Sequence, residues 1–364
     1  MDIERFRVKL PRCKSDKKIE RKEKMKSKLF VLLSLIVIAS MVFAGCAPAP
    51  APTEAAAPTA EPAKVFKIAG QAPDLENPAW AAMYGGLKDK AEELGMEADL
   101  YNASGSPETQ YANAQDMVVK GYDAVAQSGT DSSTTNAAVK EFNTADIPVW
   151  ILHIKPDDPT AEYVAMVDAQ NEAGNYDAGK YLAKTYKDKG MTGVAGEITI
   201  SLARSNGAAR HAGFEKAMKE EGIELKEVKE AITYTRDEAY QFAQDLINAN
   251  PDLNIIWSNY DEAAMGALKA IEDAGKSGEI LVGGFDGSPE SLKAVKDGRM
   301  NVMAIQPLYK HGTIVAQQMF DWLTSGKKPE SVSTDCPLVT TENAATEAEK
   351  YLADCFGPTA KFPE

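Results

Sequence analysis

The chain has 364 residues, of which 44% are hydrophobic, and this length suits about two globular domains of ~100–200 residues each. Charge is uneven, because residues 1–45 carry 12 Lys+Arg and 5 Asp+Glu, which leaves 28 Lys+Arg against 49 Asp+Glu, a net charge near −21, for the rest. Such an acidic surface repels nucleic acid, so no nucleic-acid partner is expected.

The first 45 residues are predicted to be a signal peptide. Residues 1–28 are basic, and residues 29–44 form an uncharged apolar run of 16 residues. A transmembrane helix needs ~20 residues, so this run is short for a membrane span and typical of a signal-peptide core. An uncleaved membrane anchor is the alternative. Because the basic segment is long for such a leader, we expect translation to start at Met25.

The residues that follow indicate lipid attachment. They read Met41-Val42-Phe43-Ala44-Gly45-Cys46. This stretch resembles the lipobox of bacterial lipoproteins, which implies cleavage before Cys46 and a diacylglycerol on its thiol. Residues 46–64 then form a Pro/Ala tether that would hold the folded part away from the bilayer. We therefore expect an extracytoplasmic protein, periplasmic or on the cell surface, that is lipid-anchored to the bacterial cell membrane.

From residue 65 onward, short apolar runs alternate with helical patterns. The predicted strands are 66–71, 97–101, 124–127, 149–154, 163–167, 193–200, 227–233, 255–259, 281–285 and 302–305. The predicted helices include 80–94, 107–119, 173–186, 206–221, 237–249, 262–274 and 311–323. Several helices are expected to end at a glycine, the usual left-handed stop, at Gly95, Gly121, Gly222, Gly275, Gly298 and Gly326.

This alternation predicts an α/β fold with parallel sheets and right-handed crossovers. About ten strands fit two doubly wound sheets better than one. The strand at 163–167 follows another strand without a helix between them, so a crossing between two domains is expected there. A second break in the pattern falls near Gln306-Pro307.

The four cysteines are Cys13, Cys46, Cys336 and Cys355. Cys13 precedes the expected cleavage point and Cys46 would be lipidated, which leaves Cys336 and Cys355. Outside the cytosol we expect a disulfide between these two. No His or second Cys pair lies near them in the sequence, so no metal site is expected.

Common catalytic motifs are absent from the sequence. There is no Gly-x-x-x-x-Gly-Lys-Ser/Thr loop, no Gly-x-Ser-x-Gly elbow and no His-Glu-x-x-His. The histidines His153, His211 and His311 are scattered, and no carboxylate pair stands out among the acidic residues. We therefore expect a binding protein rather than an enzyme, with no catalytic residue and no cofactor.

Polar and aromatic residues follow many of the predicted strands, at the strand ends where open parallel sheets bind ligands. They are Asp74, Asn77, Trp80, residues 128–131, His153, Asp168, residues 204–210, Tyr234, residues 259–261, Asp286 and Gln306. Carboxylates, amides and Arg suit hydroxyl groups, and aromatic faces suit the C–H face of a sugar. This set predicts a site for a small polyhydroxylated ligand.

Several short segments between residues 65 and 335 carry a family resemblance. They are residues 77–80, 123–125 with 130–131, 145–149, 261–268 and 282–289. In their order and spacing the chain resembles the type I periplasmic (solute-) binding proteins of ABC transporters, in the ribose/galactose-binding branch. The resemblance implies two doubly wound lobes joined by a three-strand hinge that close over a ligand. The expected lobes are residues 65–167 plus 307–335 and residues 168–306 plus 336–364.

The resemblance also implies ligand contacts at matching positions. These are Asn77, Trp80, Arg210, Tyr234, Asp286 and Gln306. Asp131, His153, Asn259 and Tyr260 are added because they follow predicted strands.

Structural interpretations of these residues stay open. Trp80 could be a core residue and Arg210 a surface residue on a helix. Asp131 could be a helix N-cap, Asp286 a turn residue and His153 a satisfied polar residue.

Three departures from the ribose-binding pattern bear on the ligand. The Asp-Arg pair after the fourth strand is replaced by His153-Ile154, the Asn before the Asp-Glu motif by Tyr260, and a second aromatic near Trp80 by Ala79. These changes remove hydroxyl-binding charge and add bulk. We therefore expect an uncharged sugar, a deoxysugar or a polyol rather than ribose.

Signal peptide, tether and two-lobed fold together predict a monomeric binding protein that delivers a monosaccharide or polyol to an ABC permease. A ligand-sensing protein of the same fold, for a quorum signal, a nucleoside or a chemoreceptor ligand, is the alternative, and neighbouring genes would separate the two. A secreted enzyme would need a catalytic constellation that the sequence does not show. A transcriptional repressor core is disfavoured by the lipobox and by the absence of an N-terminal helix-turn-helix.

Overall fold

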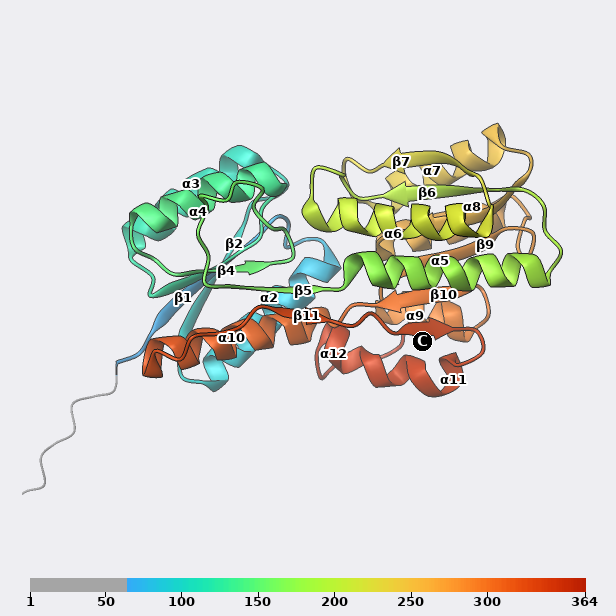
Figure 1. Ribbon diagram of the computed structural model, residues 1–364. Helices are drawn as coiled ribbons and strands as arrows, with labels where there is room; N and C mark the ends of the chain where they lie inside the picture. The colour runs from blue at the N-terminus through green and yellow to red at the C-terminus, as the bar shows by residue number, and fades with distance from the viewer. Residues whose placement is uncertain (1–63) are drawn as a thin grey trace, which may run out of the picture. The chain divides into compact units, whose positions relative to one another are not determined.

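The computed structural model describes residues 64–364. The predicted signal peptide, the predicted lipidation site Cys46 and residues 46–63 of the tether lie outside this range. The described chain builds two lobes, each with a six-stranded sheet between helices (Figure 1). The predicted α/β class with two mainly parallel sheets is confirmed.

The first lobe contains the sheet β11-β5-β4-β3-β1-β2, in which all neighbouring strands are parallel. Its elements are β1 (Lys67–Ala72), α2 (Pro78–Glu93), β2 (Glu97–Asn102), α3 (Pro107–Lys120), β3 (Ala124–Gln127), α4 (Ser132–Thr144), β4 (Val149–Leu152), β5 (Ala165–Ala169), α10 (Leu308–Ser325) and β11 (Val332–Thr334).

The second lobe contains the sheet β12-β10-β9-β8-β6-β7, in which β12 runs antiparallel to β10 and the other neighbours are parallel. Its elements are α5 (Asn171–Asp188), β6 (Val194–Thr199), α6 (Ser205–Glu221), β7 (Leu225–Glu230), α7 (Arg236–Ala249), β8 (Leu253–Ser258), α8 (Asp261–Asp273), β9 (Leu281–Asp286), α9 (Pro289–Lys296), β10 (Val302–Ile305), β12 (Leu338–Thr340), α11 (Ala344–Glu347), the 3₁₀ helix η1 (Ala348–Tyr351) and α12 (Leu352–Phe356).

Helix ends follow local chemistry. Asp131 caps α4 in a capping box with Thr134, and Ser106 caps α3. The glycines predicted to end helices all have a positive φ, namely Gly95, Gly121, Gly222, Gly275, Gly298 and Gly326. These stops could be read from the sequence because they depend on neighbouring residues alone.

Apolar residues cover both faces of each sheet and form four buried clusters. In the first lobe, one cluster lies under α2 and α10 and contains Trp150, and the other lies under α3 and α4 and contains Phe142. In the second lobe, Trp257 belongs to the cluster under α5 and α6, and Ile256 to the cluster under α7, α8 and α9. Burial on both faces explains why inner strands such as β3, β4 and β10 read as short, mainly apolar runs.

Two glycines allow α2 and α10 to pack closely. A Cβ atom at Gly86 would lie 2.1 Å from the carbonyl oxygen of Tyr309, and one at Gly312 would lie 1.9 Å from that of Met83. A side chain at either position would therefore push the helices apart. Since α2 carries Trp80 in its first turn, this packing fixes the position of Trp80.

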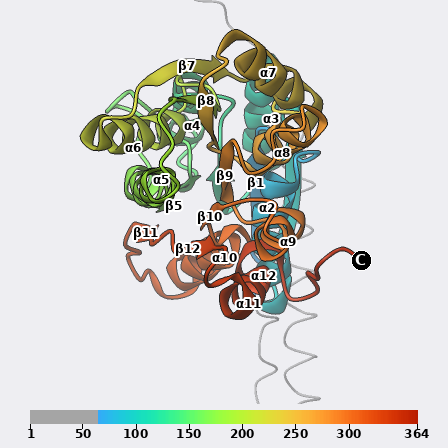
Figure 2. The same cartoon turned by 90° about the vertical axis from the view of Figure 1, so that its right-hand side faces the viewer.

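The chain passes between the two sheets after β5, after β10 and between β11 and β12. The C-terminal segment adds a further link, because α11 and η1 pack against α9 of the second lobe and α12 packs against α2 and α10 of the first. Figure 2 shows α12 beside α10. An ion pair of 3.0 Å between Lys310 and Asp354 joins α10 to α12.

Some elements were not predicted from the sequence. The strands β11 and β12 have three residues each, which is too short for a periodic pattern to show. The predicted strand at 149–154 ends at Leu152, because His153 has a φ of 64° and leaves the extended conformation.

The expected disulfide between Cys336 and Cys355 is wrong for this structure, in which both thiols are free and buried. Cys336 packs in the cluster under α5 and α6, and Cys355 packs in the cluster under α7, α8 and α9, so the two lie in different cores. Burial raises the pKa of the Cys336 thiol to about 12 and that of Cys355 well above its ordinary value. Both thiols are therefore unreactive core residues.

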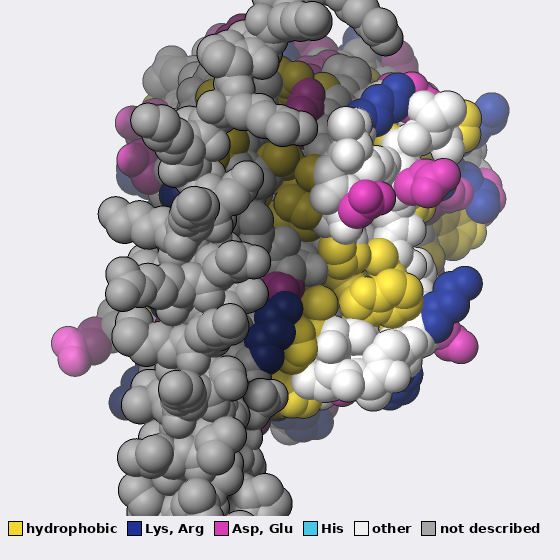
Figure 3. Space-filling view, turned by 90° about the vertical axis from the view of Figure 1, so that its left-hand side faces the viewer, with side chains coloured by type: hydrophobic (Ala, Val, Ile, Leu, Met, Phe, Trp, Pro, Cys, Tyr) yellow, Lys and Arg dark blue, Asp and Glu magenta, His cyan; other side chains and the backbone are white. Residues whose placement is uncertain are grey.

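Hydrophobic side chains on the face shown in Figure 3 are flanked by charged side chains of both signs. The large hydrophobic side chains with the greatest exposure in the described chain, Val119 and Ile232, lie in different lobes. Among residues 64–364, no helix combines the length and the apolar character needed to cross a membrane.

Candidate functional site

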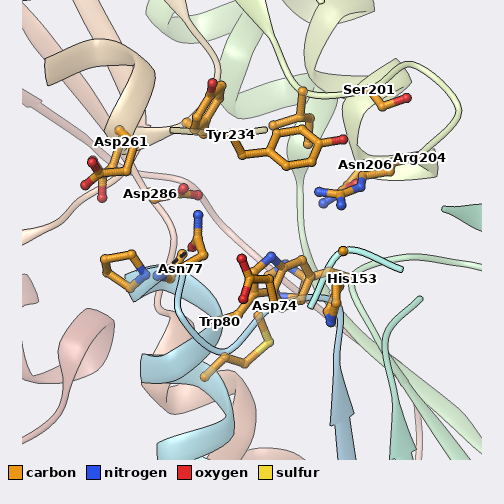
Figure 4. Close-up of a pocket in the computed structure, with 18 of the residues that line it drawn as sticks. Asp74, Asn77, Trp80, His153, Ser201, Arg204, Asn206, Tyr234, Asp261 and Asp286 are labelled. Atoms are coloured by element: carbon orange, nitrogen blue, oxygen red, sulfur yellow. Dashed lines mark hydrogen bonds between the residues drawn. The ribbon is translucent and has the colours of Figure 1, made fainter. Parts of the chain in front are cut away.

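A cavity of about 520 Å³ lies at the carboxyl ends of strands from both sheets. Segments after β1 to β4 of the first lobe and after β6 to β10 of the second lobe line it. Figure 4 shows side chains of both lobes facing this space. Ligands of open parallel sheets bind at such strand ends, so this cavity is the candidate site.

Of the ten residues predicted as ligand contacts, nine line this cavity, namely Asn77, Trp80, Asp131, His153, Arg210, Tyr234, Tyr260, Asp286 and Gln306. Asn259 does not line it. Its Oδ1 accepts a hydrogen bond from the N–H of Ile200, and its Nδ2 donates to the hydroxyl of Thr199. The side chain of Asn259 therefore ties β8 to the end of β6, and it is unavailable to a ligand.

Arg210 of α6 is the centre of a buried polar network. Its Nε donates to Oδ1 of Asn171 at 2.8 Å, one terminal nitrogen donates to the carbonyl oxygen of Asn259 at 2.8 Å, and the other donates to Oε1 of Gln306 at 3.0 Å. Oδ1 of Asp286 lies 3.5 Å from the guanidinium and accepts a hydrogen bond from Nε2 of Gln306 at 2.9 Å. The network holds three cavity-lining side chains in fixed positions.

Two buried carboxyl groups lie together on the second-lobe side of the cavity. Burial raises the pKa of Asp286, and the Arg210 guanidinium works against that rise. Burial raises the pKa of Asp261 well above its ordinary value, and the neighbouring charge of Asp286 raises it further. The N–H of Ser288 donates to Asp261 at 2.7 Å. The Asp286 backbone has a φ of 103°, a conformation that costs energy in a non-glycine residue and often marks a functional site.

Aromatic rings stand on opposite walls of the cavity. Trp80 belongs to the first lobe, and Tyr234 and Tyr260 belong to the second. The ring centroids of Tyr234 and Tyr260 lie 6.2 Å apart. The guanidinium of Arg204 lies 4.2 Å from the centroid of the Tyr234 ring. A flat ligand between these walls would meet an aromatic face on each side.

His153 serves the hinge as well as the cavity. One ring nitrogen lies 2.8 Å from a ring nitrogen of His311, whose other nitrogen lies 2.7 Å from the Thr334 hydroxyl. Burial lowers the pKa of His153 well below its ordinary value and that of His311 to about 3, so both rings are neutral. His153 also meets the edge of Trp80, with 5.9 Å between ring centroids. These two hydrogen bonds thus connect the end of β4 to α10 and to β11.

Two further predicted residues cap helices at the cavity rim. Oδ1 of Asn77 accepts a hydrogen bond from the N–H of Ala79 at 3.0 Å, and its amide nitrogen points into the cavity (Figure 4). Asp131 accepts from the N–H of Thr134 at 2.7 Å, so the N-cap interpretation of Asp131 is confirmed. A capping side chain has part of its hydrogen-bonding capacity occupied before any ligand arrives.

Further residues line the cavity besides the ten predicted contacts, namely Asp74, Ser201, Arg204, Asn206, Asp261 and Phe356. Asp74, Arg204, Asn206 and Asp261 belong to the polar residues that follow predicted strands, whereas Ser201 and Phe356 were not singled out. Phe356 lies in the C-terminal helix α12, and no local pattern connects it to the site. In the part of the chain that the structure covers, no three His, Cys, Asp or Glu side chains are grouped so that they could hold a metal ion.

The sequence of residues 71–328 matches the periplasmic binding protein domain. The ribose import binding protein of Escherichia coli (strain K12) is 32% identical over 230 residues, which cover 62% of this chain and 74% of that protein. The D-allose-binding periplasmic protein of the same organism is 28% identical over 278 residues, which cover 73% of this chain and 89% of that protein.

A solved structure with the same fold is that of the Caulobacter myo-inositol binding protein bound to myo-inositol. It superposes with a TM-score of 0.73 at 25% identity and covers 79% of this chain and 98% of that chain. Since the domain match spans most of the chain, the protein belongs to the periplasmic binding protein family, in its sugar-binding branch. That family consists of transporter binding proteins rather than enzymes.

Proposed function

We propose that this protein is the extracytoplasmic substrate-binding lipoprotein of an ABC importer, and that it binds a monosaccharide or polyol in the cavity between its lobes. Anchoring through Cys46, delivery to a permease and a monomeric state are parts of this proposal. It is supported by relatives whose names assign them ribose import and D-allose binding.

One observation carries the proposal: the cavity combines aromatic rings with buried, pre-oriented hydrogen-bonding groups. Asp286, Arg210 and Gln306 are each less than 5% exposed and bond to one another. Carboxylate oxygens accept hydrogen bonds from sugar hydroxyls, while the guanidinium and amide N–H groups donate to them. Trp80 and Tyr234 can cover the C–H faces of a ring. A volume of about 520 Å³ suits a ligand of monosaccharide size.

Capture would proceed by hinge closure. We propose that residues 65–167 plus 307–335 and residues 168–306 plus 336–364 move as two bodies about the three crossings. Ligand bound to both lobes stabilises the closed form by its greater affinity for that form. The permease would then recognise the closed form.

The first test is ligand-induced stabilisation of residues 64–364, which form one compact unit. Melting temperatures are recorded against monosaccharides, polyols, nucleosides and amino acids. A ligand that binds only the folded state adds about 2.7 kcal/mol at a hundredfold excess over Kd. The shift should come from a monosaccharide or polyol and should vanish in Asp286→Asn.

The matched control is Asp297→Asn, which removes a carboxylate from the end of α9, away from the cavity. This variant should keep the full ligand-induced shift. A shift with a nucleoside and with no sugar or polyol would contradict the assignment and favour the ligand-sensing alternative.

A further inference from the structure

The cavity contains an arginine whose guanidinium forms no salt bridge with a carboxylate of the described chain. Arg204 directly precedes α6 and is 5% exposed. Its Nε donates to the carbonyl oxygen of Thr130 at 2.7 Å, and its guanidinium stacks on Tyr234. Within residues 64–364, its two terminal nitrogens make no hydrogen bond and it forms no salt bridge within 4.0 Å of a carboxylate oxygen. Burial lowers the pKa of Arg204, although arginine stays protonated in proteins.

Other donors lie at the same end of the cavity. The α6 helix has 17 residues and no side-chain hydrogen bond caps its N-terminus. Helix N-termini favour negative charge. The hydroxyl of Tyr260 is fully buried without a hydrogen-bond partner in the described chain, so it does not face the open cavity. The end formed by Arg204 and the α6 N-terminus is called the donor end below.

Acceptors gather at the opposite end of the second-lobe wall. Asp261 and Asp286 lie on one side of this wall in Figure 4, and Arg204 and Asn206 lie on the other. The first-lobe carboxylates that line the cavity are Asp74 and Asp131. The charge of Asp131 favours the protonated form of Arg204, but its carboxylate already caps α4.

The terminal nitrogens of Arg204 are not among the fully buried atoms that lack a partner, so they are open to the cavity, where a ligand can supply an oxyanion. Two terminal N–H groups on one side of a guanidinium match the two oxygens of a carboxylate or phosphate. Sugar hydroxyl groups, in contrast, suit the carboxyl groups of Asp261 and Asp286 at the opposite end of the cavity.

From this polarity we propose that the ligand is an anionic monosaccharide, with an oxyanion held by Arg204 at the donor end and hydroxyls held by Asp286 and its partners. The inference rests on the proposed function and narrows it to sugars that carry a carboxylate or a phosphate group. It replaces the sequence-based expectation of an uncharged ligand. Arg204 belongs to the second lobe, and its Nε donates to the carbonyl oxygen of Thr130 in the first lobe. An oxyanion bound to Arg204 would therefore hold this side chain in the position that joins the two lobes.

The test is calorimetric titration of the full chain, in a detergent without a sugar head group, with stereochemically matched ligands. Each aldohexose is compared with its uronate and its 6-phosphate. The preferred anionic form should bind about ten- to a hundredfold tighter than its neutral parent. A preference for the uronate or for the phosphate identifies the source of the oxyanion.

Arg204→Gln should abolish this preference while neutral sugars keep their affinity. Lys216→Gln removes one positive charge from the exposed face of the same helix and should leave the preference intact. If a variant fails to fold, the wild-type comparison still decides the matter. Equal or tighter binding of neutral sugars would overturn the inference and leave the proposed function standing, whereas binding of no sugar, acid or phosphate would overturn both.

Discussion

At the scale of single residues, the hinge contains a carboxyl group whose ionisation opposes folding. Asp168 at the end of β5 lies 3.8 Å from Nδ1 of His153 and accepts a hydrogen bond from the Asn171 side chain at 2.9 Å. Burial raises the pKa of Asp168 to about 7. The folded state therefore binds more protons than the unfolded state between pH 3.8 and about 7, and stability falls as pH rises through that window.

Asp168→Asn should remove this dependence. Relative to the variant, the wild-type protein should lose on the order of 2–4 kcal/mol of unfolding free energy between about pH 4 and pH 7. Urea unfolding of ligand-free protein at several pH values measures the difference. Asp297→Asn serves as the exposed control, and its pH profile should follow that of the wild type. Parallel profiles for Asp168→Asn and wild type would rule out this role for Asp168.

Asp286 and Asn259 both lie at the ends of buried strands, but only Asp286 lines the cavity. The family resemblance implied Asp286 as a ligand contact, and this residue at the end of the buried strand β9 does line the cavity. Asn259 occupies an equivalent position after β8, yet its amide is taken up by Ile200 and Thr199. Periodicity cannot distinguish these two outcomes, because they depend on what the neighbouring strand offers.

At the scale of elements, the short helix α12 connects the two lobes and the cavity. Phe356 at its end lines the cavity and packs against the cluster under α2 and α10 and also against the cluster under α7, α8 and α9. The segment from α11 to α12 has helical pieces of four or five residues, too short to be stable without tertiary packing. Its position was therefore decided by the surfaces it covers.

Phe356→Ala should weaken both stability and ligand binding. The loss of apolar contacts from a partly buried ring should cost about 1–3 kcal/mol of unfolding free energy, and ligand affinity should fall about three- to tenfold. Phe362→Ala is the matched control, since Phe362 packs against the second-lobe cluster and does not line the cavity. Thermal unfolding and calorimetry should show a stability loss alone for Phe362→Ala. Identical binding losses in the two variants would contradict a cavity role for Phe356.

At the scale of the two lobes together, hydrogen bonds join them beside the cavity. The N–H of Ser132 donates to the carbonyl oxygen of Ala203 at 3.2 Å, and the N–H of Ser205 donates to the Ser132 hydroxyl at 3.1 Å. The N–H of Lys155 donates to the Ser205 hydroxyl at 2.8 Å. These bonds exist only while the lobes are in contact, so under the proposed hinge closure they would favour the closed form.

Ser205→Ala removes the acceptor for the Lys155 N–H. One neutral hydrogen bond contributes about 0.5–1.5 kcal/mol, so ligand affinity should fall about two- to tenfold. Small-angle scattering should show a smaller change in radius of gyration at a fixed ligand concentration than in the wild type. Ser133→Ala, which removes a hydroxyl bonded within the first lobe, should change neither value. Unaltered affinity in Ser205→Ala would show that these bonds do not favour closure.

The sequence by itself determined the features that depend on neighbouring residues along the chain. These are the strand–helix alternation, the glycine stops, the choice of two sheets and the polar residues at strand ends. Each rests on backbone preference or on periodicity, which act over a few residues. Most of the predicted contacts line one cavity because the strand ends that they follow meet there.

Only the tertiary structure decided which side chains have partners. It placed Cys336 and Cys355 in separate cores, occupied the amide of Asn259 and brought Phe356 to the cavity from the C-terminus. It also left the terminal nitrogens of Arg204 without a partner among the described residues. Pairing depends on distances between segments that are far apart in the chain, and such distances are set by how sheets and helices pack.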